Sequence, residues 1–335
     1  MSNRRILLFL VLLPIINIFF INPDLNSYLS YSCLLFIPAS YCTIKSGTFL
    51  YFREKWLKYM RWLCVISILV QVMHDLGVIN PGGADIRNNP TTLYFFNCDW
   101  GMYRLSSVFW EPGQFQILLI TTLCLFTDEL AKWNKVKSIL KRFGAILLAL
   151  IMTLSTTGYL CFMILIISIA LFPRQKTLSI KTKLFSLLFS TGFVILLILS
   201  SAVQEKVEQS QDLSQNSSTT VRLADNLALI SAIAESPWLG YGIDSKKQKD
   251  ALEKHGTFTS SNGWLYSASG YGIVYVVVIL VCIYMKIKKM PRSIPPYIIW
   301  ITFFLSQCNE YIIFFPYLYL FLFDFKRSTK VIQYL

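Results

Sequence analysis

Residues 264–285 read WLYSASGYGIVYVVVILVCIYM, and Lys286, Lys288 and Lys289 follow almost directly. The run has no charged side chain, and its length is close to the roughly 20 apolar residues with which a helix crosses a bilayer. A cluster of cations after such a run is typical of the cytoplasmic end of a membrane span. The stretch therefore predicts a transmembrane helix whose C-terminal end faces the cytoplasm.

Apolar runs of similar length recur along the whole chain and predict its fold class. Of the 335 residues, 55% are hydrophobic and 15% are charged, a composition that a soluble domain of this length would not tolerate on its surface. We predict an all-α polytopic membrane protein, with residues 1–335 forming a single transmembrane domain of about ten helices. The predicted spans are 5–22, 28–50, 60–80, 105–127, 141–156, 158–173, 184–203, 264–285, 294–309 and 311–325.

Two pairs of these spans have almost no linker, so each pair could instead be one long kinked element. The pairs are 141–156 with 158–173, and 294–309 with 311–325. The expected number of transmembrane helices is therefore eight to ten.

The distribution of Lys and Arg predicts the orientation of the chain. With the N-terminus inside, 23 of the 31 Lys and Arg residues fall in segments on the cytoplasmic side, and most of the others fall in one long exterior loop. Cations near span ends stay cytoplasmic, so both termini are expected in the cytoplasm. The formal net charge of +13 is then a topology signal, and no basic groove for nucleic acid is expected.

Several kinds of chemistry are disfavoured because their sequence motifs are absent. The eight cysteines show no CxxC or metal-ligand spacing, and the chain has no HExxH pattern. It also has no GxxxxGKS/T or GxGxxG nucleotide loop and no GxSxG nucleophile elbow. We therefore expect no metal, no cofactor and no ATP-driven or serine-hydrolase mechanism.

Two exterior loops are predicted, residues 81–104 and the larger residues 204–263. In the larger loop, residues 221–235 have apolar side chains at helical spacing, and Pro237 stops the pattern. The apolar positions are Leu223, Leu227, Ile230 and Ile233 or Ala234. We expect a short amphipathic helix here, which lies on the membrane surface or caps the helix bundle.

Arg104 and Glu111 flank the start of the fourth span and are candidates for function, because ionisable groups at membrane depth are costly unless they are paired or hydrated. Pro112 requires either a kink in a helix that begins earlier or a break that places Glu111 at a new helix N-terminus. A simpler alternative is an ion pair between Arg104 and Glu111 that only fixes the helix end.

Three residues near the exterior side have side chains suited to phosphate binding or proton transfer. Arg222 opens the amphipathic helix, and its guanidinium could hold a phosphate or lie in solvent. His255 could act as a general base, although a single loop histidine is more often a solvated surface group. His74, near the exterior end of the third span, is the weaker candidate of the two histidines.

Three pieces in this order resemble the O-antigen polymerase and ligase superfamily, and together they cover roughly residues 100–285. The pieces are Arg104 to Pro112 opening a span, the polar turn Ser155-Thr156-Thr157-Gly158, and the long exterior loop. The loop motifs are Arg222, Glu235-Ser236-Pro237-Trp238-Leu239-Gly240-Tyr241-Gly242, His255, Ser261-Asn262-Gly263-Trp264 and Gly270-Tyr271-Gly272.

The resemblance implies an inverting, metal-independent glycosyl transfer from an undecaprenyl-pyrophosphate-linked glycan, on the periplasmic face of the bacterial inner membrane. In this interpretation Arg104 and Arg222 would stabilise the leaving pyrophosphate. Glu111 and His255 are the two candidates for the general base, and the choice between them stays open. The residues implied for sugar binding are Tyr241, Trp238 and Asn262.

Within this superfamily, the modest length of the chain, its dispersed Phe and Tyr residues and the Glu111-Pro112 pair favour a polymerase of O-antigen repeat units, with an O-antigen ligase as the alternative. Besides the lipid-linked glycan and membrane lipid, a chain-length regulator and a flippase are the expected partners. A flippase or transporter of lipid-linked sugars is a further possibility, but transporters usually show repeats in matching halves, and the large loop is single. A membrane acyltransferase would need a catalytic histidine on a span, where only His74 is available.

Overall fold

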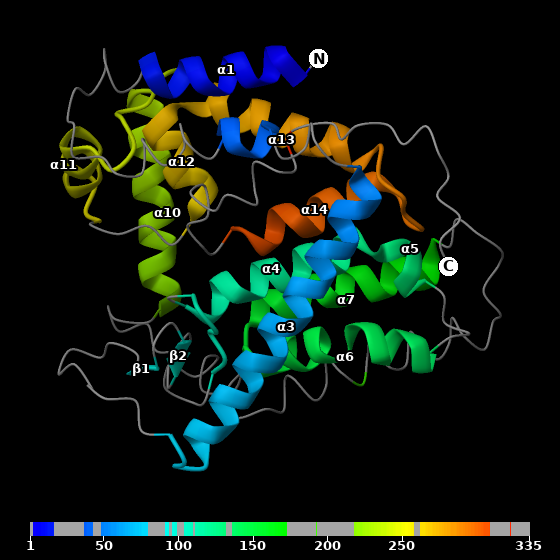
Figure 1. Ribbon diagram of the computed structural model, residues 1–335. Helices are drawn as coiled ribbons and strands as arrows, with labels where there is room; N and C mark the ends of the chain where they lie inside the picture. Colours follow the sequence, from blue (N-terminus) through cyan, green and yellow to red (C-terminus); the bar gives the residue numbers. More distant parts are fainter. Residues whose placement is uncertain are drawn as a thin grey trace. The chain divides into compact units, whose positions relative to one another are not determined.

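The computed structural model describes most of the helical part of the chain (Figure 1). The contacts between Cα atoms divide the chain into two compact units. The first unit comprises Met1–Glu54, Gln215–Lys289 and Glu310–Leu335, and the second comprises Lys55–Ser214 and Met290–Asn309. The described residues are 3–16, 37–42, 48–79, 91–93, 96–98, 104–109, 111–131, 136–172, 192, 218–257, 262–308 and 322. That residues 1–335 form a single transmembrane domain stays a prediction.

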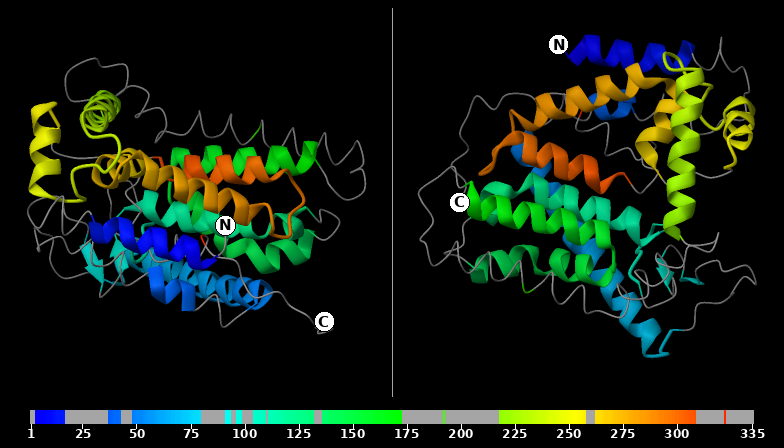
Figure 2. Two further views of the ribbon diagram at one scale, coloured as in Figure 1. Left: turned by 90° about the horizontal axis from the view of Figure 1, so that it is seen from above. Right: turned by 180° about the vertical axis from the view of Figure 1, so that it is seen from behind.

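In the first unit, a group of four helices comes from the region of the predicted exterior loop and the span after it. Helix α10 packs against α11 and α12, and α12 packs against α13. The bounds are α10 Ser218–Glu235, α11 Lys246–Lys254, α12 Gly263–Tyr271 and α13 Ile273–Ile287, and α1 (Asn3–Ile16) belongs to the same unit. Helix α10 runs across the N-terminal end of α13 rather than along it (Figure 1, Figure 2).

The predicted span 264–285 is not one continuous helix. It is broken at Gly272, whose φ of 88° lies in the left-handed region that favours glycine, so that α12 ends and α13 begins there. The predicted amphipathic helix is confirmed as α10, which begins three residues earlier than expected and ends at Glu235, as Pro237 requires. Helix α11 was not predicted, because its sequence KKQKDALEK has few apolar residues to indicate a helical face.

The second unit is built around three helices that contact one another, α4, α7 and α14, with α6 packed on α4 and α7. Nearly every residue of α4 is buried, which places this helix in the centre of the unit. The bounds are α3 Phe49–Asp75, α4 Pro112–Leu125, α5 Thr127–Leu130, α6 Val136–Met152, α7 Thr156–Leu171 and α14 Pro296–Ser306. The first residues of α3 belong to the first unit.

A two-stranded antiparallel hairpin in the predicted exterior loop 81–104 departs from the all-α expectation. Strand β1 (Thr91–Leu93) pairs with β2 (Phe96–Cys98), with Thr91 opposite Cys98. Two residues connect the strands, which is the commonest length for such a hairpin. The all-α class is confirmed for the other described elements.

The helices test some of the predicted spans and leave others open. The predicted spans 141–156 and 158–173 correspond to two separate helices, α6 and α7, rather than to one kinked element. Of the described helices, α3 alone is long and apolar enough to cross a membrane by itself, and α4, α7, α13 and α14 are shorter apolar helices. Residues 311–321 and nearly all of 184–203 lie outside the described residues. The number of spans and the positions of the termini stay predictions.

Candidate functional site

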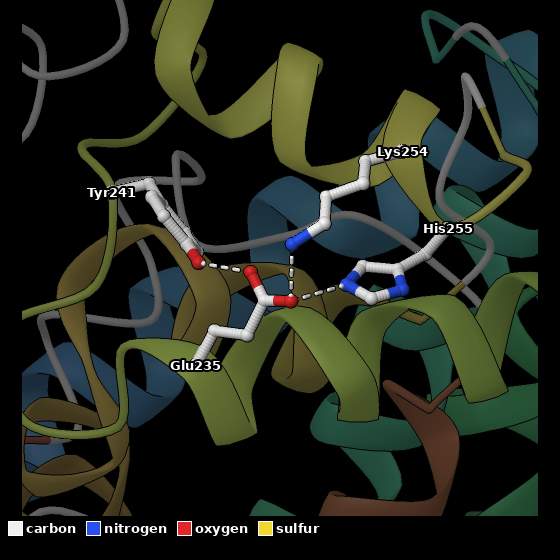
Figure 3. A network of polar contacts seen from close by, with 4 residues as sticks. All are labelled: Glu235, Tyr241, Lys254 and His255. Carbon is white, nitrogen blue, oxygen red and sulfur yellow. Dashed lines mark hydrogen bonds and ion pairs between the residues drawn. The ribbon is translucent and has the colours of Figure 1, made fainter.

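Four polar side chains meet at the C-terminal end of α10, and we call them the Glu235 cluster: Glu235, Tyr241, Lys254 and His255 (Figure 3). Lys254 Nζ lies 2.7 Å from Glu235 Oε1, and His255 Nε2 lies 3.1 Å from the same oxygen. The Tyr241 hydroxyl donates to Glu235 Oε2 at 3.1 Å. One carboxylate therefore joins three elements: the end of α10, the segment after it, and the end of α11.

Helix α11 brings Lys254 and His255 to this carboxylate because it is fixed to α12 by a buried amide. Gln248 is fully buried, and its Nε2 donates to the Ser269 hydroxyl at 2.7 Å and to the Tyr266 carbonyl at 3.1 Å. The Ser245 hydroxyl caps the helix by accepting from Gln248 N at 2.8 Å. The last turn of α11 is thereby held at a fixed position relative to α12.

The segment from Pro237 to Gly242 is held against the break between α12 and α13 by backbone hydrogen bonds. Tyr241 N donates to Ser269 O and Gly242 N to Gly270 O, both at 2.9 Å. Ile273 N, at the start of α13, donates to Pro237 O at 2.8 Å. These bonds position Tyr241 and need a close approach of two backbones, which explains why the segments contain glycines.

The contacts within the cluster change the acidity of two of its groups. The pKa of Glu235 is lowered, first by the hydrogen bond from Lys254 and then by the hydrogen bond from Tyr241. The pKa of Tyr241 is raised, first by partial burial and then by its hydrogen bond to the Glu235 carboxylate. Glu235 is therefore a carboxylate at neutral pH, and a carboxylate can only accept hydrogen bonds.

This argument fixes the tautomer of neutral His255. Because Glu235 can only accept, Nε2 of His255 must hold the hydrogen that the pair shares, and Nδ1 then has the free lone pair. None of the described residues forms a hydrogen bond with Nδ1. The His255 side chain as a whole is 23% exposed.

The lowered pKa of Glu235 predicts how the stability of this cluster depends on pH. A carboxyl group with a depressed folded-state pKa stabilises the fold above its ordinary pKa of 4.5 and loses that contribution as the pH falls through the depressed value. We expect Glu235→Gln to lower the melting temperature of the purified protein at pH 7. The difference from the wild type should shrink steadily below pH 4.5, in melting curves recorded at a series of pH values. A difference that stays constant down to pH 3 would contradict the assignment.

The remaining candidate residues of the first unit do not join the cluster. Trp238 is 71% exposed beside it, whereas Asn262 Oδ1 accepts from Trp264 N and Leu265 N and so caps α12. Arg222 is exposed near the start of α10, 13 residues before Glu235 in the chain, which is about 20 Å of helix. It forms no hydrogen bond or ion pair with another described residue.

Arg104 and Glu111 lie in the second unit, and the structure decides between the alternatives for this region. Glu111 has an extended backbone, with φ −132° and ψ 148°, and α4 begins at Pro112, so the helix breaks and leaves Glu111 at its N-terminus. Arg104 Nε donates to Thr153 O at 3.2 Å. The ion pair between Arg104 and Glu111 is not formed. Arg104 and Arg222 belong to different units, so their convergence on one pyrophosphate stays a prediction.

The polar turn at residues 155–158 is a helix N-terminus. Ser155 caps α7 by accepting from Gly158 N at 3.4 Å, and Gly158 leaves room for the side chain of Gln116 on α4. His74 lies next to Asp75 at the end of α3, with Nδ1 3.4 Å from the carboxylate. In the described part of the chain, no three His, Cys, Asp or Glu side chains are placed to hold a metal ion. Metal independence stays a prediction.

Sequence reasoning identified His255 and Tyr241 but missed Glu235 and Lys254 as members of a site. In the sequence, Glu235 ends the amphipathic helix and opens a loop motif of the resemblance, but it has no predicted role in a site. A weak signal was present, because an acidic residue at the C-terminal end of a helix opposes the helix dipole and so indicates a cationic partner elsewhere.

A comparison with protein families relates this geometry to known proteins. The profile of a family described as O-Antigen ligase matches residues 143–280 of the chain, about two fifths of its length. The match confirms the predicted superfamily.

The matched residues include the whole Glu235 cluster together with α7 and α10, whereas Arg104 and Glu111 precede them. The O-antigen ligase family is a family of membrane proteins with glycosyltransferase-like activity in polysaccharide biosynthesis, which supports an enzyme of this general type. No curated protein and no solved structure matched the chain.

Proposed function

We propose that this protein polymerises undecaprenyl-pyrophosphate-linked oligosaccharide repeat units into O-antigen or a related surface polysaccharide, at the periplasmic face of the bacterial inner membrane. The observation that carries the proposal is the pairing of His255 with Glu235 at 3.1 Å, in a loop within the residues that match the O-antigen ligase family. A histidine fixed in one tautomer by a carboxylate is suited to accept a proton from a sugar hydroxyl.

In the proposed reaction, a hydroxyl of the acceptor glycan attacks the anomeric carbon of the donor glycan. The bond between that carbon and the pyrophosphate oxygen breaks, the lipid pyrophosphate leaves, and the configuration inverts. The hydroxyl proton passes to Nδ1 of His255, while Nε2 stays bonded to Glu235. The Glu235 carboxylate then lies next to the imidazolium and stabilises its charge.

The leaving pyrophosphate needs cations in a site of low dielectric constant, and Arg104 and Arg222 are proposed for this role. Arg222 is about 20 Å along α10 from Glu235, a separation that leaves room for a sugar between a bound pyrophosphate and His255. Tyr241 is proposed to stack on the sugars. Because Asn262 caps α12, its side chain is less available for sugar binding than the sequence suggested.

Glu111 remains the alternative general base. Its carboxylate forms no hydrogen bond or ion pair with another described residue, so nothing in the described chain occupies it. Glu111 precedes the residues that match the O-antigen ligase family, however, whereas His255 lies within them. We therefore favour His255.

An O-antigen ligase is the second candidate, because that is the description of the matching family. The glycan of a deletion strain separates the possibilities. One repeat unit on the lipid anchor supports the polymerase, and unattached polymer supports the ligase. Absence of the repeat unit from the periplasmic side would support a flippase or transporter of lipid-linked sugars.

Removal of either proposed pyrophosphate ligand should abolish chain extension. We expect Arg104→Ala and Arg222→Ala to reduce glycan polymerisation about 10²–10³-fold, because each removes a cation from the leaving group. Both variants should reach the membrane in normal amounts. Lys249→Ala removes an exposed cation from α11 and is the matched control, with no expected effect. Wild-type banding of surface glycan in either arginine variant would exclude that residue from pyrophosphate binding.

A further inference from the structure

Helix α13 has a regular apolar stripe on its exposed side. The residues of the stripe recur at intervals of four. They are Ile273, Val277, Val281 and Met285, and their exposed fractions are 41%, 49%, 53% and 47%. The opposite side of α13 is buried. In a membrane protein, an exposed apolar stripe on a helix of this kind faces lipid.

Two more exposed apolar side chains continue this stripe at the N-terminal end of α13. Trp238 is 71% exposed and Leu239 is 45% exposed, and the bond from Ile273 N to Pro237 O holds their segment next to the first residue of the stripe. Tryptophan is enriched at the boundary between lipid and water, because its ring is apolar and its N–H can bond to water or headgroups. Trp238 therefore marks the exterior boundary of the bilayer on α13.

Helix α10 also has an exposed apolar stripe, on the side opposite the face that packs against its neighbours. Asp225, Ala228, Leu229, Ala232 and Ile233 are buried, whereas the opposite side exposes Leu223 by 60%, Leu227 by 57% and Ile230 by 52%. Because α10 runs across the end of α13, an α13 that crosses the bilayer leaves α10 along the membrane surface (Figure 1, Figure 2). This arrangement is typical of interfacial amphipathic helices.

We infer that the stripe of α10 and the Trp238–Leu239 segment form one surface that binds the lipid bilayer at its exterior interface. Two observations favour lipid over a protein partner. The surface is continuous with the lipid-facing stripe of α13. Exposed cations are also present, Arg222 on α10 itself and Lys246 and Lys247 on α11, which packs against α10, and cations attract anionic headgroups.

This inference rests on the proposed function and adds the route by which the donor reaches the site. Glu235 and Trp238 are three residues apart, so their Cα atoms can be separated by at most about 11 Å. A Trp238 at the membrane boundary therefore places the Glu235 cluster at the level of the headgroups. A lipid-linked pyrophosphate lies at that level, so the donor diffuses laterally to His255 without leaving the bilayer.

A depth measurement on the full-length protein tests the inference. A fluorescent amino acid is introduced at position 227, 238 or 249, and each variant is reconstituted into phosphatidylethanolamine and phosphatidylglycerol vesicles with or without brominated acyl chains. We expect bromine to lower the fluorescence by about half at 227 and 238 and to leave 249 unchanged, because only the first two contact acyl chains. Quenching at 227 or 238 no stronger than at 249 would overturn the inference. Labels at 223 and 230 provide a repeat if a label at 227 prevents folding.

A kinetic comparison separates this inference from the proposed function. Leu227→Gln should raise the KM for a long-chain lipid-linked donor in vesicles and should leave the use of a short-chain soluble donor in detergent unchanged. An equal loss with both donors would mean that Leu227 acts other than through lipid contact. Failure of the wild type to use either donor would refute the proposed function and leave the quenching result intact.

Discussion

Replacement of Gly272 by alanine should prevent the protein from folding stably. Gly272 has a φ of 88°, and a Cβ atom built there would lie 2.0 Å from Trp238 O and 2.4 Å from its carbonyl carbon. The left-handed conformation alone costs a side chain about 1–2 kcal/mol. The clash adds to this cost because both partners are backbone, which cannot rotate away as a flexible side chain can. The bond from Ile273 N to Pro237 O should break as the two segments separate.

Gly144, in the middle of α6, provides the matched control for this substitution. A Cβ atom there meets nothing within 4 Å, so Gly144→Ala should raise stability by about 0.5–1 kcal/mol through the higher helix propensity of alanine. The measurement is a melting curve in detergent, with size-exclusion chromatography as a check on aggregation. A Gly272→Ala protein that melts within a degree or two of the wild type would show that the α12–α13 break is not held against Trp238.

Proline sets two helix ends, one of which the sequence predicted, while it left the other as one of two alternatives. Pro237 ends α10 at Glu235, and Pro112 begins α4 with Glu111 outside the helix. Proline restricts the backbone by its own covalent structure, so its effect can be predicted from a few neighbouring residues. The break at Gly272 could not be predicted in this way. It depends on a contact with Trp238, which is far away in the chain, and the surrounding run is apolar throughout.

The candidate site shows the same difference between local and tertiary information. His255 could be identified from its residue type and its place in an exterior loop. Its pairing with Glu235 could not, because it requires α11, whose position is fixed by the buried contact between Gln248 and Ser269. Tyr241 was predicted as an aromatic surface for sugars, whereas its hydroxyl also bonds to Glu235. Residue chemistry was therefore predictable, and the partner of each residue was not.

Loss of the His255 imidazole should have the largest effect on the rate of the proposed reaction. We expect His255→Ala to reduce kcat about 10²–10⁴-fold, the usual contribution of a general base. KM for the donor should change little, because His255 acts on the acceptor hydroxyl. The assay follows elongation of purified lipid-linked repeat units by the reconstituted full-length protein. Glu111→Gln, which removes the alternative base and preserves the size of the side chain, is measured in parallel.

Two substitutions at position 235 separate the orientation of His255 from the stabilisation of its charge. The amide oxygen of Glu235→Gln can still accept from Nε2, so this variant keeps the tautomer and loses the negative charge. Glu235→Leu loses both, so kcat should fall in the order wild type, Gln, Leu. Lys254→Met is the matched control, because it removes another partner of Glu235 Oε1 and leaves the bond to His255 in place. Equal activity of the Gln and Leu variants would exclude a role for Glu235 in orienting the imidazole. If His255→Ala keeps its kcat and Glu111→Gln loses it, Glu111 is the base, and the Glu235 cluster only holds α11 against α10.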